Sequence, residues 1–169
     1  LVENPYWEGA KISLYSAGEE SIASMPNIKV GKFITQVILQ NIEVEDIDLS
    51  NATDLRSAWV QNNPALQKLD LSYSTIWGQG DKETEGNGTY GSSLMVLGCP
   101  ILKEIKLPEK NELKAYRIDI ECLDALETFD MSNVKMVAEL SIGDLNKDFN
   151  LVYPELTIFY SEDGYAGTY

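Results

Sequence analysis

The stretch that decides the fold is residues 92–108, SSLMVLGCPILKEIKLP, because its second half is a phrase that recurs along the chain. Counting from Leu102, apolar residues hold the first, fourth and sixth places of a short strand. Further copies lie at 42–49 (IEVEDIDL), 64–71 (PALQKLDL), 124–131 (DALETFDM) and 154–161 (PELTIFYS). One copy cannot bury its own apolar side chains, so the copies are expected to stack and share a continuous core.

The spacing of the copies favours a leucine-rich repeat, whose length is roughly 20–29 residues. Val44 and Leu66 are 22 residues apart, and Leu102 and Leu126 are 24 apart. The interval from Leu66 to Leu102 is 36, but it falls to 22 if the polar residues 78–91 are an inserted loop; the interval from Leu126 to Leu156 is 30. The pattern predicts an α/β solenoid, a short irregular leucine-rich repeat with a strand-lined concave face. An ordinary α+β domain with chance matches is the alternative.

The segments between the phrases predict the rest of each coil. Residues 55–60 and 93–98 are expected to be helical, whereas 116–120 and 137–142 have the rhythm of strands. Residues 1–41 do not fit the repeat and contain two β-rich runs, 11–15 and 33–39. We therefore expect residues 1–41 to form an N-terminal β cap over the open end of a solenoid at residues 42–169, as one compact unit.

Composition narrows the range of partners. The 169 residues are enough for one domain, and they carry a net charge of −14 and no histidine. Such a charge repels phosphate backbones and anionic lipids, which argues against nucleic acid and direct membrane adsorption. The sequence has no apolar run long enough for a membrane-spanning helix. It starts at Leu1, so we expect a processed or trimmed form, in which any signal peptide or lipid anchor would be missing from the sequence.

The two cysteines precede equivalent leucines and should therefore lie at the same corner of adjacent coils. Cys99 stands three residues before Leu102, and Cys122 stands four residues before Leu126. We expect two buried free thiols, because free cysteine behaves as a small core residue. A disulfide across the stack is the alternative.

The segment LGCPILKEIKLP resembles the F-x-G-C-x-x-L-x-x-I-x-L-P phrase of the irregular leucine-rich repeats in the BspA-like group of bacterial surface proteins. The matching residues are Gly98, Cys99, Leu102, Ile105, Leu107 and Pro108, with Cys122, Leu126 and Phe129 in the next repeat. The resemblance covers about residues 42–161 and implies a secreted or surface-anchored binding protein without catalytic residues. It further implies an outer-membrane lipoprotein that accompanies nutrient importers, so that the expected partner is a protein such as an outer-membrane transport complex.

The first candidate site is the outward face of the repeated strands. Acidic side chains gather there at the third and fifth places of the phrase: Asp46, Asp48, Asp70, Glu104 and Asp130. We predict that this acidic face binds a protein partner, because stacked repeats create extended binding surfaces. The alternative is a sheet whose polar residues only face water.

The second candidate site is aromatic and points to a glycan as the alternative ligand. Tyr73, Trp77 and Tyr90 flank or lie in the glycine-rich insertion, and exposed aromatic rings can stack on sugars or anchor a protein interface. Alternatively, Trp77 packs inward and pins the insertion to the core.

The third candidate is a calcium site. The oxygen-bearing residues at places 1, 3, 5, 7 and 12 of a calcium-binding loop are Asp144, Asn146, Asp148, Asn150 and Glu155. The loop pattern requires glycine at place 6, where this sequence has Phe149.

Catalysis has little support from the sequence. It contains no histidine, no nucleophile motif and no phosphate-binding loop, so that only hydrolysis by two carboxylates stays open. We predict a binding protein and no enzyme.

Overall fold

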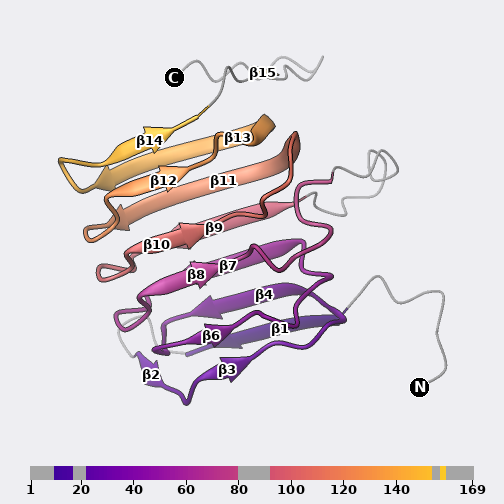
Figure 1. Ribbon diagram of the computed structural model, residues 1–169. Coiled ribbons are helices and arrows are strands. Elements are labelled where there is room, and N and C mark those ends of the chain that lie inside the picture. The colour runs from indigo at the N-terminus through magenta and orange to yellow at the C-terminus, as the bar shows by residue number, and fades with distance from the viewer. Residues whose placement is uncertain (1–9, 17–21, 80–91, 154–156, 159–169) are drawn as a thin grey trace, which may run out of the picture.

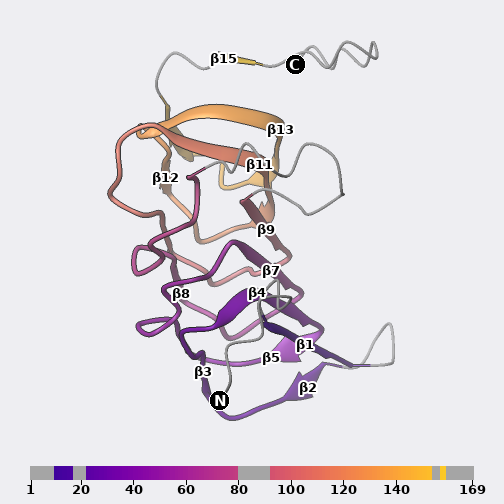
Figure 2. The ribbon, with the colours of Figure 1, turned by 90° about the vertical axis from the view of Figure 1, so that its right-hand side faces the viewer.

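The computed structural model describes residues 10–16, 22–79, 92–153 and 157–158, and these form a parallel β-solenoid of about six turns. The coils stack from the N-terminal end to the C-terminal end of the molecule (Figures 1 and 2). The described residues contain no helix, and hence no helix that is long and apolar enough to cross a membrane. The predicted solenoid is confirmed.

One side of every coil contributes to a long-strand sheet of seven parallel strands. Its strands are β1 (Ala10–Tyr15), β4 (Ile34–Gln40), β7 (Ser57–Gln61), β9 (Ser93–Leu97), β11 (Leu113–Leu123), β13 (Val134–Leu145) and β15 (Thr157–Ile158). The strands follow one another in the sheet in chain order, so each coil lays one strand beside the strand of the previous coil (Figure 1).

The other side of the solenoid is built from short strands, most of which lie within copies of the recurring phrase. These are β3 (Ile28–Lys29), β6 (Ile47–Asp48), β8 (Lys68–Asp70), β10 (Glu104–Lys106), β12 (Thr128–Asp130) and β14 (Asn150–Val152). They form the parallel pairs β3–β6, β8–β10 and β12–β14, and β2 (Ala23–Ser24) pairs with β5 (Ile42–Glu43) near the N-terminal end. The strands predicted at 42–49, 64–71, 100–107 and 124–131 are confirmed.

The core lies between the two sets of strands. Two inward columns of the long-strand sheet run through consecutive coils: Val37, Ala58, Leu94 and Ile118, and Leu39, Val60, Val96 and Ile120. The short strands contribute Leu69, Ile105 and Phe129 to the same cluster. All seven core residues expected from the phrase are buried in it: Leu69, Leu71, Leu102, Ile105, Leu107, Leu126 and Phe129.

The predicted helices, and with them the α/β class, are wrong for the described residues. Residues 57–61 form β7 and 93–97 form β9. In β7, Ala58 and Val60 point into the core while Trp59 and Gln61 lie on the outside, a period of two. A run of six residues is too short to separate this period from that of a helix turn. Pairing with parallel strands on both sides then decides for the strand. The strands predicted at 116–120 and 137–142 are confirmed in β11 and β13.

The last phrase lies elsewhere than expected. Phe129 of β12 pairs with Leu151 of β14, which is 22 residues further on. The copy that follows 124–131 is therefore at β14, and the irregular interval of 30 residues disappears. Most of the expected copy at 154–161 lies outside the described residues.

The region expected to be a cap supplies the first strands of the same sheets. The predicted strands at 11–15 and 33–39 correspond to β1 and β4, and β4 pairs with β1 on one side and with β7 on the other. Sheet pairing therefore runs without a break across the boundary expected between residues 41 and 42.

From the second coil on, the chain turns one corner through a residue in the left-handed backbone region. The five residues at this corner, with their φ angles, are Asn41 (54°), Asn62 (54°), Gly98 (63°), Cys122 (55°) and Asp144 (49°). Their backbones bond between coils: the amide of Asn62 donates to the Leu97 carbonyl (2.8 Å), and that of Gly98 to the Glu121 carbonyl (3.0 Å). This repeating corner explains the Gly-Cys pair of the phrase, because glycine adopts the left-handed region at no steric cost.

The same corner accounts for the two cysteines, both of which are free. Cys99 is buried, as expected, and burial raises the pKa of its thiol to about 11. Cys122 is exposed, so the expectation that it is buried is wrong. Cys122 lies at the left-handed corner position, where Gly98 lies in the preceding coil, whereas Cys99 is one residue past it and points inward.

We expect Gly98→Ala to destabilise the protein. A Cβ atom there would lie 2.6 Å from Oδ1 of Asn62, and the left-handed backbone costs an L-residue roughly 1–2 kcal/mol. Gly31→Ala is the matched control, because its added Cβ meets no atom within 4 Å. Urea unfolding of both variants measures the difference, and equal midpoints would contradict the role of this corner.

We expect Ile105→Ala to lower the free energy of unfolding by roughly 2–5 kcal/mol, because it empties a buried place in the stacked core. Ile101→Ala removes the same atoms from a side chain that is 40 % exposed, so its effect should stay within about 0.5 kcal/mol. If Ile105→Ala unfolds at the same urea concentration as Ile101→Ala, the short strands do not share the core.

Candidate functional site

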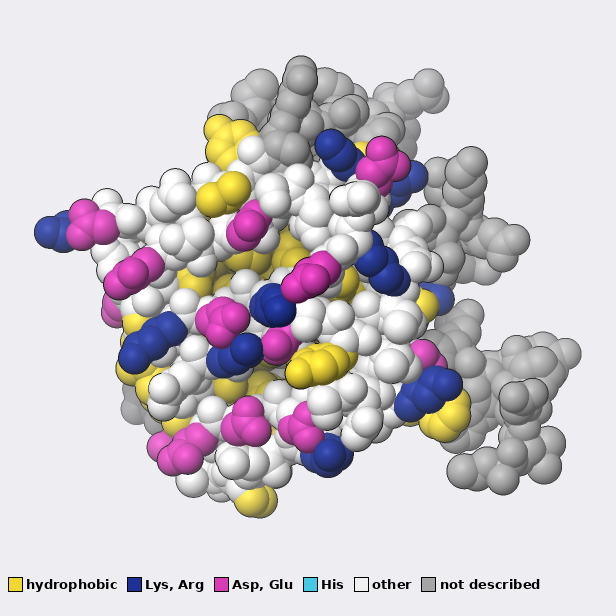
Figure 3. Space-filling view, in the orientation of Figure 1, with side chains coloured by type: hydrophobic (Ala, Val, Ile, Leu, Met, Phe, Trp, Pro, Cys, Tyr) yellow, Lys and Arg dark blue, Asp and Glu magenta, His cyan; other side chains and the backbone are white. Residues whose placement is uncertain are grey.

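The short-strand face, defined as the outward side chains of β3, β6, β8, β10 and β12, carries the acidic residues predicted to bind a partner. Asp48, Asp70, Glu104 and Asp130 lie on these strands, and Asp46 comes directly before β6. Figure 3 shows acidic and basic side chains interleaved on this side of the molecule. The structure therefore brings the predicted residues onto one face, but in the company of lysines.

Ion pairs within the chain neutralise part of this face. Nζ of Lys29 lies 3.0 Å from Oδ2 of Asp48. Nζ of Lys68 lies 3.3 Å from Oδ2 of Asp70 and also 3.3 Å from Oε2 of Glu104. The hydrogen bonds from Lys68, first to Glu104 and then to Asp70, raise the pKa of Lys68. These acids are therefore already paired with lysines of the same chain. Lys29 lies in β3, outside the repeat recognised in the sequence, so the phrase gave no sign of its pairing.

Three of these aspartates also build the turns that end their strands. An aspartate Oδ1 accepts a hydrogen bond from the amide two residues on: Asp48 from Ser50 (2.9 Å), Asp70 from Ser72 (3.0 Å) and Asp130 from Ser132 (2.9 Å). Hydrogen bonds to Ser132 lower the pKa of Asp130. Burial opposes the same shift at Asp70, but the bonds from Ser72 and Lys68 outweigh it and lower the pKa. All three carboxylates are therefore charged and held in place at neutral pH.

We expect the Asp48 carboxyl to titrate with a pKa of about 2 instead of 3.8, chiefly because it accepts a hydrogen bond from the Ser50 hydroxyl, and then from the Ser50 amide and from Lys29. Since the folded pKa is the lower one, its stabilisation is complete above the unfolded value and is lost as the pH falls through about 2. An NMR titration measures the midpoint, and Ser50→Ala should raise it more than Lys29→Met does. A midpoint at 3.8 in the wild type would contradict the turn geometry.

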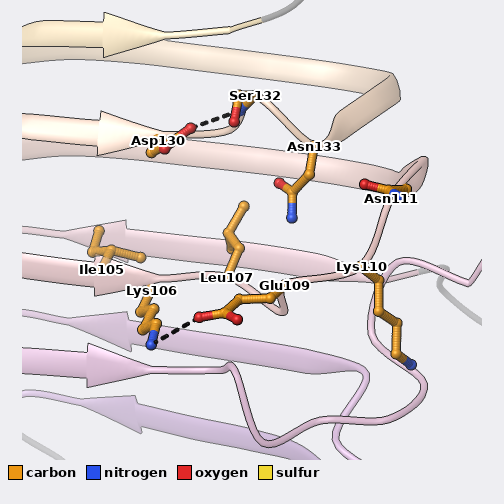
Figure 4. A pocket seen from close by; sticks show the side chains of 9 residues that line it. All are labelled: Ile105, Lys106, Leu107, Glu109, Lys110, Asn111, Asp130, Ser132 and Asn133. Carbon is orange, nitrogen blue, oxygen red and sulfur yellow. Dashed lines mark hydrogen bonds and ion pairs between the residues drawn. The ribbon is translucent and has the colours of Figure 1, made fainter.

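An open groove crosses this face where the third phrase leaves its strand. Its nine lining residues are Ile105, Lys106, Leu107, Glu109, Lys110, Asn111, Asp130, Ser132 and Asn133 (Figure 4). The coil is longer here: Lys106 is 11 residues before Arg117, whereas Asp130 is 9 residues before Glu139, the pairing partner of Arg117. The extra residues form the loop that borders the groove.

Hydrogen bonds hold this loop against the neighbouring coils. Nδ2 of Asn133 donates to the Pro108 carbonyl (2.5 Å), and Lys110 donates to the Thr75 carbonyl. Lys106 points toward Glu109, with which it forms an ion pair at 3.3 Å (Figure 4). The groove offers amide, hydroxyl and charged groups, so it suits the polar edge of a protein interface.

The predicted aromatic site does not form as expected. Trp77 is fully buried, and its indole N–H donates to the Ser93 carbonyl (3.5 Å). It therefore pins the chain beside the insertion and cannot stack on a sugar. Tyr73 is exposed, and Tyr90 lies outside the described residues.

The residues of the predicted calcium loop take part in a corner and a strand. Asp144 is the left-handed corner residue, Oδ1 of Asn146 accepts from the Asp148 amide (2.9 Å), and Asn150 begins β14. Glu155 lies outside the described residues. Within the described ranges, no group of three or more acidic, cysteine or histidine side chains is placed to hold a metal ion. The calcium site stays a prediction.

Sequence reasoning missed the outer face of the long-strand sheet. Trp59, Met95 and Asp119 are neighbours there on β7, β9 and β11. Asp119 binds Arg117 at 2.7 Å, and this hydrogen bond raises the pKa of Arg117. The signal that could have found this face is the alternation of residues 57–61, which we interpreted as part of a helix.

Comparison with protein-family models, with curated proteins and with solved structures gave no match to the chain. We therefore infer the function from the geometry of the two faces of the solenoid.

Proposed function

We propose that the chain is a binding protein that docks onto another protein through its short-strand face. The observation that best supports this is the order of charges at equivalent outward places: Lys29, Asp48, Asp70, Lys106 and Asp130. These charges are fixed by turns and ion pairs, and a partner of complementary pattern would meet them in one register. Such complementarity contributes to specificity and association rate more than to affinity.

The proposal is binding without catalysis. On this face, the carboxylates bond to lysines and to turn amides, an arrangement that keeps them charged and does not prepare one as a proton donor beside another. The open, polar groove next to Asp130 fits the rim of a protein interface.

The family and the location are part of the same proposal. The Gly98-Cys99 phrase, now explained by the left-handed corner, supports an irregular leucine-rich repeat of the bacterial-surface group. On that basis we propose a cell-surface protein, anchored to the outer membrane as a lipoprotein, that serves nutrient uptake as an accessory to an outer-membrane transport complex.

The test compares two triple variants with equal changes in charge. Asp48, Asp70 and Asp130 are changed to Asn, which keeps the turns because asparagine makes the same turn bond. The control changes Asp54 and Asp124 to Asn and Glu43 to Gln, three acids outside the short-strand face. Each protein is used to capture partners from detergent-solubilised outer membranes. We expect wild type and control to retain one stoichiometric protein and the face variant to lose it.

Association of the retained protein should also weaken with salt, because the screening length falls from about 10 Å at 0.1 M to about 3 Å at 1 M. The change should lie mainly in the association rate measured by surface plasmon resonance. If the face variant associates at the wild-type rate with the same salt dependence, the short-strand face is not the docking surface.

A further inference from the structure

The outer face of the long-strand sheet carries a column of large and polar side chains that the proposed docking does not use. In register across four adjacent strands, this column consists of Ile38, Trp59, Met95 and Asp119. Trp59 is partly exposed, whereas Asp119 is only 4 % exposed. The column lies on the side of the coils opposite the short strands, so its function is separate from that of the docking face.

Two buried polar atoms in this column have no hydrogen-bond partner in the part of the chain that the structure describes. They are Nε1 of Trp59, a donor, and Oδ1 of Asp119, an acceptor. Buried polar groups are almost always paired in folded proteins, and each exception requires an explanation. One ligand that both accepts and donates hydrogen bonds could bond to the unpaired donor and to the unpaired acceptor of this column.

The spacing of the two strands that carry these residues indicates the size of that ligand. Trp59 on β7 and Asp119 on β11 are separated by one strand, β9, so their backbones lie roughly 10 Å apart. Met95 lies between them in register. Both atoms are buried, so a ligand reaches them only if a neighbouring side chain moves, and the unbranched side chain of Met95 has three rotatable bonds.

The surroundings indicate the chemistry of the ligand. On the flanking columns, Gln36 bonds to Ser57 (3.5 Å) and Gln40 to Gln61 (3.2 Å). Ser141 bonds to Glu121 (2.7 Å), and Arg117 is paired with Asp119 and with Glu139. Amides and hydroxyls that both donate and accept hydrogen bonds therefore surround an indole ring, and the cation present is balanced by acids. This environment suits an uncharged ligand rich in hydroxyl groups.

We propose that this face binds a neutral oligosaccharide, with one sugar ring stacked on Trp59. A sugar hydroxyl can accept from Nε1 of Trp59, and another can donate to Oδ1 of Asp119, which satisfies both orphan atoms. The apolar face of a pyranose ring packs on the indole, which is a large flat hydrophobic surface with a polar edge. The separation of roughly 10 Å favours a short oligosaccharide over a single sugar. The aromatic residue that stacks on the sugar is therefore Trp59, and not Trp77, which was expected from the sequence but is buried.

The test begins with an array of neutral oligosaccharides, namely short homo-oligomers of glucose, mannose, xylose and N-acetylglucosamine. We expect at least one series to bind the wild-type chain. Trp59→Ala should weaken that binding more than tenfold, and Trp59→Phe should weaken it less because the phenyl ring retains stacking. Tyr73→Ala, which removes an exposed aromatic ring outside this face, is the control and should leave binding unchanged.

An NMR measurement on the wild-type protein avoids any effect of the variants on folding. On addition of the bound oligosaccharide, the indole N–H signal of Trp59 should move as it gains a hydrogen bond. The indole N–H signal of Trp77 is the internal control, because it is already bonded to the Ser93 carbonyl in the core. Absence of binding to every series, or binding that leaves the Trp59 signal in place, overturns the proposal. Neither outcome bears on the docking of a protein to the short-strand face.

Discussion

The structure depends on parallel pairing between successive coils. Each inner strand of the long-strand sheet forms backbone hydrogen bonds with the strand of the coil before it and with the strand of the coil after it. An isolated coil would leave its backbone groups and its apolar side chains in water, so the coils are stable only as a stack. Because the register is fixed between every two coils, equivalent residues form columns. The side chains that are neighbours within one column must therefore be compatible in size and charge.

A buried polar side chain helps to hold successive coils together. Asn63 is fully buried beside the corner, where its Oδ1 accepts from the amides of Ala65 (3.0 Å) and Leu66 (3.1 Å). Its Nδ2 donates to the Val44 carbonyl (3.2 Å) in the preceding coil. The side chain therefore satisfies backbone groups of two coils at once and ties them together. In the next coil, Cys99 lies just past the corner as Asn63 does, and it is a protonated thiol at neutral pH.

Several outward charges meet the same requirement by forming ion pairs with unlike charges. Strands in one sheet lie about 4.8 Å apart, so like charges in one column would repel. Lys68 lies between two acids on the short-strand face, and Arg117 lies between two acids on the opposite face. Two faces of different character result: one carries fixed charges in a set order, and the other surrounds an indole ring with amides and hydroxyls. This difference is why we assign a protein partner to the first and a neutral sugar to the second.

The sequence by itself determined the repeat, the short strands and their core, because apolar residues recur in each phrase at the places of Leu102, Ile105 and Leu107, with the spacing of a strand. It also determined which acids lie on the outward face, since alternation along a strand assigns Asp70 and Asp130 to the side away from the core. Only the tertiary structure decided the nature of the return segments. Six residues around Trp59 fit either a helix or a strand, and pairing with β4 and β9 settles the strand. The tertiary structure alone also decided which charges form ion pairs. The partners of Asp48 and Glu104 come from neighbouring coils, and no local sequence pattern encodes the register between coils.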